Sequence, residues 1–229
     1  MKATISIFIA MLFSYSVLAD TKKTETEASK WLSGWERERS EGPINSECRQ
    51  HTSKIKQCKF TAIVDESVES LSAVVLDLEN FKDWAVSVKV SDIVTYPNDS
   101  DLYVYTTYEF VGAYNRDALT RYTPELDLEK NAIKIKFITV DKEIETSDLR
   151  LVRFPLMAGY WQFRRLSNGK TEIEHLSFAL PGGVVQKALY PLYNIGYLDS
   201  SFETIRALQK QSLKPQYQSA NFASLNLKN

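Results

Sequence analysis

The chain has 229 residues, of which 44% are hydrophobic and 25% are charged, and its formal net charge is −1. This is an ordinary globular composition, with enough residues for one sizeable core and too few for two large domains. The charge balance lacks the basic excess of a nucleic-acid-binding protein, so we expect no nucleic acid as a partner.

The first nineteen residues predict a cleaved signal peptide. Lys2 precedes an apolar run over residues 5–17, which is about as long as a signal-peptide core and short for a membrane span. Residues 17–19 supply small side chains at the cleavage positions, so residues 1–19 are the expected leader. We expect export to the periplasm or the medium, with residues 20–29 as a flexible N-terminal segment; an uncleaved anchor is the alternative.

Export changes the interpretation of the two cysteines, because oxidising compartments favour disulfides. Cys48 and Cys58 lie in two segments, residues 44–49 and 56–64, that are expected to pair as a hairpin. We therefore predict a Cys48–Cys58 disulfide. The histidines at positions 51 and 175 have no ligand-type spacing to these cysteines, so we expect no metal site and no cofactor.

Two amphipathic helices are predicted in the first half of the chain. The first has its apolar positions at Ala28, Trp31, Leu32 and Trp35 and ends before Gly42-Pro43. The second begins at Ser67, a residue type that caps helix N-termini. Its apolar positions follow at three- and four-residue spacing: Val68, Leu71, Val75 and Leu78, continued by Phe81 and Trp84.

The middle and the end of the chain predict further strands and one long helix. The strands are expected over residues 88–95, 102–111, 117–123 (ended by Pro124), 133–140, 160–165 and 171–180. After the Pro181-Gly182-Gly183 corner, apolar residues recur at helical spacing: Val185, Leu189, Leu192, Leu198, Phe202, Ile205 and Leu208. Pro191 and Gly196 are expected to interrupt this helix, as a hinge or as a static kink. Residues 213–229 predict a polar, loosely ordered tail.

The order of these elements predicts an α+β fold in which a curved antiparallel sheet wraps around the long C-terminal helix. Several fragments, in this order, also resemble the START (steroidogenic acute regulatory protein-related lipid transfer) domains of the helix-grip superfamily. They are Trp35, Gly42-Pro43-Ile44, Phe60-Thr61-Ala62, Asp77-Leu78-Glu79, Trp84, Asn115-Arg116-Asp117, Arg153, Gly159-Tyr160-Trp161 and Pro181-Gly182-Gly183. The resemblance covers residues 30–212. Val184-Val185 stands where the family has a proline.

The resemblance implies a lipid-binding cavity between the sheet and the C-terminal helix, and a charge of the Arg116-Asp117 motif inside it. Neighbouring strand residues point to opposite faces, so one of the two enters the cavity, with Glu109 or Arg153 as an expected partner. This group receives a lipid hydroxyl or head group, or else forms a structural ion pair. Further candidates for the lining are Tyr105, Trp84, Trp161, His175 and Tyr193.

Core packing is the alternative role for each aromatic candidate, and a wall histidine is the favoured role of His175. A catalytic base would need an oriented partner and a nucleophile, and the spacing shows neither. We expect a protein that is not an enzyme, acts as a monomer, contacts membranes transiently, and binds or transfers a lipid or other hydrophobic molecule. The alternatives are a cyclase-, aromatase- or dehydratase-like enzyme using the same cavity, and a periplasmic adaptor without a ligand.

Overall fold

The structure is a computed structural model, and it describes residues 31–110, 114–144, 150–183, 189–221 and 225. The predicted signal peptide lies outside these residues. Among the helices of the described part, none is long and apolar enough to cross a membrane.

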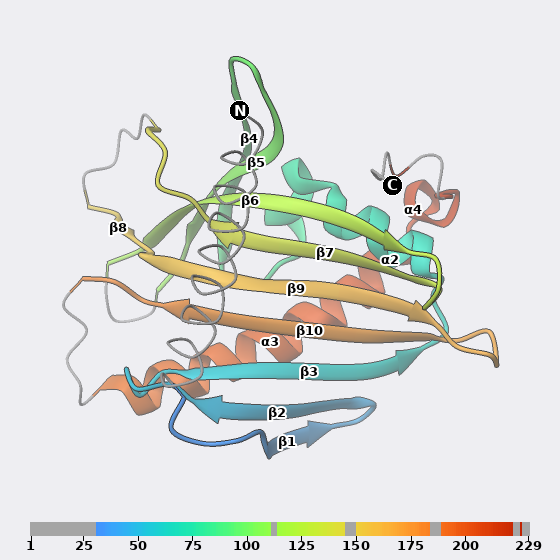
Figure 1. The fold of residues 1–229 in the computed structure, drawn as a ribbon, viewed down its shortest axis with the longest axis horizontal. Coiled ribbons are helices and arrows are strands. Elements are labelled where there is room, and N and C mark those ends of the chain that lie inside the picture. The colour runs from blue at the N-terminus through green and yellow to red at the C-terminus, as the bar shows by residue number, and fades with distance from the viewer. Residues whose placement is uncertain (1–30, 111–113, 145–149, 184–188, 222–224, 226–229) are drawn as a thin grey trace, which may run out of the picture.

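The described residues form a strongly twisted, largely antiparallel sheet with helices on one face (Figure 1). The strand order is β1-β2-β3-β10-β9-β7-β6-β5-β4, and the short β8 pairs in parallel with β6. The strands are β1 (Glu36–Glu41), β2 (Ile44–Gln50), β3 (Lys56–Val64), β4 (Val88–Tyr96), β5 (Asp99–Tyr108), β6 (Arg116–Asp127), β7 (Ala132–Thr139), β8 (Val152–Arg153), β9 (Leu156–Arg165) and β10 (Thr171–Leu180).

The helices are α2 (Val68–Leu76), the 3₁₀ helix η1 (Leu78–Asp83), α3 (Tyr190–Ser212) and α4 (Pro215–Gln218). Helix α3 runs diagonally behind the sheet, and α2 lies beside its C-terminal half (Figure 1). We call the face of the sheet that these helices cover the inner face, and the opposite face the outer face. The predicted α+β architecture, a curved sheet with a long C-terminal helix, is confirmed.

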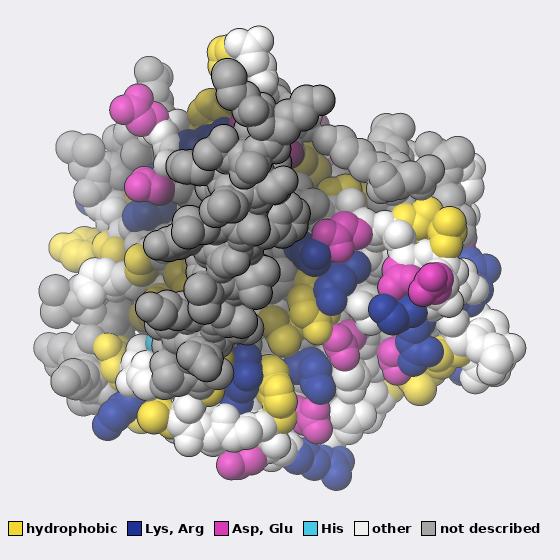
Figure 2. Space-filling view, in the orientation of Figure 1, with side chains coloured by type: hydrophobic (Ala, Val, Ile, Leu, Met, Phe, Trp, Pro, Cys, Tyr) yellow, Lys and Arg dark blue, Asp and Glu magenta, His cyan; other side chains and the backbone are white. Residues whose placement is uncertain are grey.

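The two faces of the sheet follow the alternation of the sequence. The inner face carries the main core, in which Phe60, Phe163 and Ile173 of three strands pack with Phe202 of α3. The outer face carries interspersed acidic and basic side chains (Figure 2), paired across strands as in Arg164–Glu172. The inner face is therefore dry, and most of the outer face is wet.

The N-terminal helix predicted around Trp31 is not present in the described residues. Residues from Glu36 form β1 instead, and Trp31 makes a β-bridge with His51. The Trp31 ring packs edge-on against His51 and against Phe178 of the outer face, at centroid distances of 5.1 and 5.6 Å. Tertiary packing of the tryptophan thus overrides the helical spacing of its neighbours.

Two strand and helix ends also differ from the prediction. Strand β6 continues through Pro124, because beyond Tyr122 it pairs only with β7 and the missing N–H faces an unpaired edge. Helix α3 begins at Tyr190 and places Pro191 in its first turn, where no intrahelical bond is lost, so Pro191 starts the helix rather than interrupting it. Leu192, expected on the packed face, is 65% exposed.

The segment after Leu213 differs from the loosely ordered tail that was expected. Pro215–Gln218 forms α4, and Tyr217 is buried against α2. The Tyr217 hydroxyl donates a hydrogen bond of 2.7 Å to Asp77 Oδ2 at the end of α2. One buried aromatic side chain therefore orders this polar segment.

Candidate functional site

Packing on the inner face loosens from one end to the other. Along β10, the inward side chains pass from Ile173 at 0% exposed to Ser177 and Ala179, which are each 8% exposed. Along β7, Ile133 is 0% exposed and Phe137 is 8%. Helix α3 follows the same order, with Ile205 and Leu208 buried and Tyr193 and Tyr197 half-buried.

The closed end of this face is filled by the apolar side of α2, whose Leu71 and Val74 are fully buried against β7 and β9. The other end lies under the first half of α3. We call it the open end, and it is lined by Phe137, Met157, His175, Ser177, Ala179 and Tyr193. The side chains of the open end remain partly accessible to solvent, although α3 covers them on one side and the sheet on the other.

His175 lies where the closed and open ends meet. Its ring stacks on Trp161 of β9, with centroids 3.8 Å apart and planes inclined by 17°, and Phe60 and Phe137 flank it at 6.2 Å each. Burial lowers the pKa of His175 to about 3, so the ring is neutral at physiological pH. Nδ1 lies 3.2 Å from the carbonyl oxygen of Tyr160. Because a carbonyl only accepts, Nδ1 carries the proton and Nε2 is an acceptor.

Hydroxyl groups surround this part of the inner face. Burial raises the pKa of Tyr108 to about 12 and that of Tyr122 well above its usual value, so both phenols stay protonated. Thr106 Oγ1 lies 3.1 Å from the Tyr108 hydroxyl. Thr120 Oγ1 and Trp84 Nε1 are enclosed and have no hydrogen-bond partner among the described residues. The face is thus apolar with a few uncharged polar atoms.

Arg116 adds a buried charge to the inner face, where it is 3% exposed. Its Nε donates to Pro181 O at 2.9 Å, Nη1 donates to Tyr114 O, and Nη2 lies 3.5 Å from Gly182 O. The guanidinium also lies 4.3 Å from the centre of the Phe110 ring, and burial lowers its pKa. Arg116 therefore ties the corner after β10 to the segment before β6.

Four predicted site residues lie away from the inner face. Asp117 points outward and accepts two hydrogen bonds from Arg153, of 2.9 and 2.7 Å. Glu109 pairs with Lys89 at 2.6 Å on the surface. Tyr105 shares the outward side of β5 and contributes to the electrostatic environment of Arg153. The structure thus separates Arg116 from Asp117, and it brings Arg116, Trp84, Trp161, His175 and Tyr193 to the inner face.

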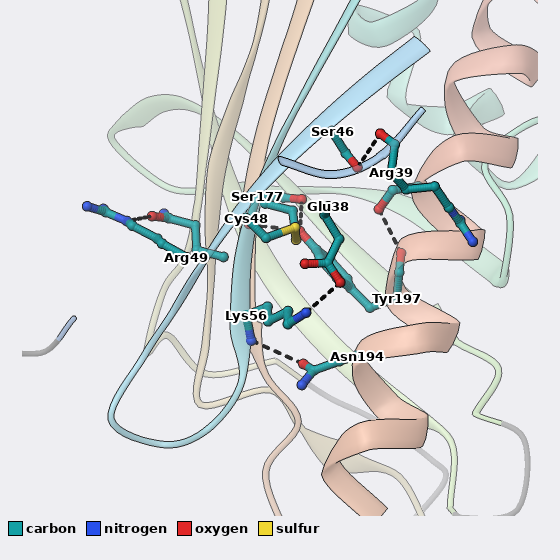
Figure 3. Close-up of a disulfide and its surroundings, with 12 residues drawn as sticks. Glu38, Arg39, Ser46, Cys48, Arg49, Lys56, Ser177, Asn194 and Tyr197 are labelled. Carbon is teal, nitrogen blue, oxygen red and sulfur yellow. Dashed lines mark hydrogen bonds and ion pairs between the residues drawn. A yellow bond between two sulfur atoms is a disulfide. The ribbon is translucent and has the colours of Figure 1, made fainter. Parts of the chain in front are cut away.

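Polar contacts hold the first half of α3 against the sheet (Figure 3). Asn194 receives a hydrogen bond from Lys56 N at 3.1 Å and donates to Lys54 O at 3.2 Å. Tyr197 donates a hydrogen bond to Ser177 O at 2.8 Å, and Tyr193 donates one to Ala179 O at 2.9 Å. The second half of α3 is held mainly by apolar packing, together with a hydrogen bond from Val86 N to Thr204 and an ion pair between Arg206 and Glu41.

The predicted disulfide is formed. Cys48 and Cys58 are directly opposite each other in the β2–β3 ladder, with Cα atoms 4.1 Å apart. The bridge lies beside Tyr197 of α3 (Figure 3) and fixes the pairing of the hairpin that α3 contacts. It therefore stabilises the strand pair that supports the open end.

Two grooves lie outside the inner face. One, of about 460 Å³, lies between α2 and α4, and the other, of about 620 Å³, follows the β6–β7 hairpin and is lined mainly by charged side chains. Neither includes a residue of the open end. Within the described ranges, no group of three or more His, Cys, Asp or Glu side chains could hold a metal ion.

Comparison with solved structures identifies the architecture. A STAR-related lipid transfer protein from Xanthomonas axonopodis is 20% identical and superposes with a TM-score of 0.69, covering 80% of this chain and 100% of that chain. Human STARD10 gives 16% identity and a TM-score of 0.68, covering 84% of this chain and 79% of that one. The chain has a START-like fold. Human StAR-related lipid transfer protein 5 shares it at 13% identity, with a TM-score of 0.66 and coverage of 87% and 96%.

No protein-family model matches the sequence, and neither does any curated protein. The START-like fold was expected from the ordered fragments, and this expectation is confirmed. The expectation that the protein is not an enzyme is corrected. Solved structures that match this chain include the Zhui aromatase/cyclase from Streptomyces sp. R1128, at 13% identity and a TM-score of 0.47, covering 67% of this chain and 91% of that chain.

Sequence reasoning missed three polar residues of the inner face: Thr106, Thr120 and Tyr122. A signal was present, because Thr120 and Tyr122 alternate with Arg116 along β6 and so point to the same face.

Proposed function

We propose that the protein binds a lipid or another hydrophobic small molecule on the inner face of the sheet, at the open end under the first half of α3. The loosening of the packing from Ile173 to Ala179 carries this proposal. A mainly apolar and aromatic wall with few polar atoms is the usual composition of a small-molecule site.

The ligand class is supported by the START-like fold. Two of the similar structures, one bacterial and one human, are named as lipid transfer proteins. Removing apolar ligand surface from water is worth about 25 cal/mol per Å² before ordering costs, so an acyl chain or a ring system supplies several kcal/mol. We further propose that the protein is exported and shields its ligand from water there; the disulfide is compatible with export.

The test compares two substitutions that fill opposite ends of the inner face. Ala179→Phe adds a ring at the open end, and Ala62→Phe adds the same ring at the closed end, where Ala62 is 2% exposed and pairs with Ile173. Binding is measured with the fluorescent probe N-phenyl-1-naphthylamine, and organic extracts of protein purified without detergent are analysed by mass spectrometry.

We expect a co-purifying lipid in the wild type and at least tenfold weaker probe binding by Ala179→Phe, with folding retained. Ala62→Phe should lower the free energy of unfolding by about 1–3 kcal/mol, because it overpacks a filled core, while its folded fraction binds the probe normally. Wild-type protein that is empty and ignores the probe would contradict the proposal, as would unchanged binding by Ala179→Phe.

A further inference from the structure

His175 is held in one orientation from three sides. The Trp161 ring stacks on one side of it at 3.8 Å, Phe60 and Phe137 flank it, and Nδ1 bonds to a backbone carbonyl. Stacking of the ring alone would not determine which imidazole nitrogen is protonated. The contacts together determine which nitrogen is protonated and where the other nitrogen points.

The other nitrogen, Nε2, has no hydrogen-bond partner among the described residues. His175 is 8% exposed although its ring lies between the sheet and α3. Nε2 is therefore an uncharged hydrogen-bond acceptor, on a side chain that keeps some exposure, at the inner limit of the open end.

On the basis of the function proposed above, we propose that His175 determines ligand specificity by accepting a hydrogen bond at Nε2 from an uncharged hydroxyl group of an otherwise apolar molecule. The ligand class is then a lipid alcohol, with its hydroxyl at His175 and its apolar body along Phe137, Met157 and Ala179.

A neutral acceptor discriminates against two related ligand types. An ether of the same length has no proton to donate, so Nε2 would be left without a partner. A carboxylate has no proton to donate either, and its oxygen lone pairs would repel the lone pair of Nε2. The charge of Arg116 does not reverse this preference, because its guanidinium already donates to the carbonyls of Tyr114, Pro181 and Gly182.

The experiment measures displacement of N-phenyl-1-naphthylamine by 1-tetradecanol, 1-methoxytetradecane and tetradecanoate. Wild-type protein should bind the alcohol about five- to tenfold more tightly than the ether, the ratio expected for one net hydrogen bond, and more tightly than the carboxylate. His175→Phe keeps a stacked ring and removes Nε2. In this variant the alcohol and the ether should bind within twofold of each other, with the affinity for the ether unchanged.

Equal binding of alcohol and ether by the wild type, tighter binding of tetradecanoate, or an alcohol preference that survives His175→Phe would overturn this inference alone, because the probe would still be bound. Failure of the wild type to bind the probe or any of the three compounds would overturn the proposed function as well.

A second measurement avoids any dependence on the variant's folding. The chain has two histidines, and His51, on the outer face, serves as the internal reference. Imidazole ¹H–¹⁵N correlation spectra of the wild type should show His175 protonated at Nδ1, with an Nε2 resonance that shifts on addition of 1-tetradecanol and not on addition of the ether. An Nε2 that is protonated, or that does not respond to the alcohol, would contradict the assignment.

Discussion

Among single residues, His175 links folding stability to pH. Its folded-state pKa of about 3 lies below the ordinary value of 6.5, because burial disfavours the charged ring. Below pH 6.5 the unfolded chain therefore takes up a proton that the native state does not. The stabilising contribution is complete above pH 6.5 and decreases by about 1.4 kcal/mol per pH unit as the pH falls toward 3.

Urea unfolding at pH 7.5 and at pH 5.0 measures this effect. The wild type should lose about 2 kcal/mol between these pH values through His175 alone, and His175→Phe should lack this part of the loss. His51→Phe is the matched control for removal of an imidazole and should retain the part of the loss that His175 contributes. If the two variants lose stability in parallel, the histidine is not the buried neutral base described here.

The Asp117–Arg153 pair is predicted to contribute more to folding stability than an exposed ion pair does. Asp117 is buried, with a side chain 3% exposed, whereas Arg153 is 39% exposed, so removing the arginine leaves a buried carboxylate unpaired. Arg153→Met should lower the free energy of unfolding by about 2–3 kcal/mol. Lys89→Met removes one partner of the exposed Lys89–Glu109 pair and should change the free energy of unfolding by no more than about 0.5 kcal/mol. Chemical denaturation gives both values, and similar costs would show that the Asp117 pair is not a buried one.

Among the elements, β9 depends on Gly159, the fourth of its ten residues. A Cβ atom at Gly159 would lie 2.0 Å from the backbone oxygen of Leu176 and 2.7 Å from the Phe137 ring. Gly159→Ala should therefore cost at least about 3 kcal/mol, since backbone as well as side chain must move. Gly196 lies inside α3 with open space around it, and Gly196→Ala should stabilise the protein by about 0.5–1 kcal/mol. Thermal unfolding of the two variants tests this contrast, and a tolerated Gly159→Ala would contradict it.

Most elements could be predicted from the sequence because local pattern and tertiary packing agree. Strands β3 and β7 alternate, and α2 is capped by Ser67, whose side chain accepts from Ser70 N. Prediction failed where a distant contact decided the conformation. Trp31 packs on Phe178 of β10, and Tyr217 bonds to Asp77 after α2; neither contact leaves a periodic signal in its own segment.

For the whole molecule, ordered short motifs were sufficient to predict the START-like fold, because their spacing reflects the sequence of elements around one sheet. The lining of the inner face was less predictable. The alternation along β6 places Arg116 and Asp117 on opposite faces, but only the three-dimensional pairing shows which one faces α3 and that Arg153 reaches the other. The loosening of the packing toward Ala179 depends on where α2 ends, which sequence periodicity does not report.

The central claim is that the inner face admits an apolar guest at its open end. Intermolecular NOEs between unlabelled N-phenyl-1-naphthylamine and methyl-labelled protein test it most directly. We predict contacts to the methyl groups of Met157 and Ala179 and none to those of Ala62 and Ile173 at the closed end. Contacts confined to the outer face or to the α2–α4 groove, or no contacts at saturating probe, would contradict the account.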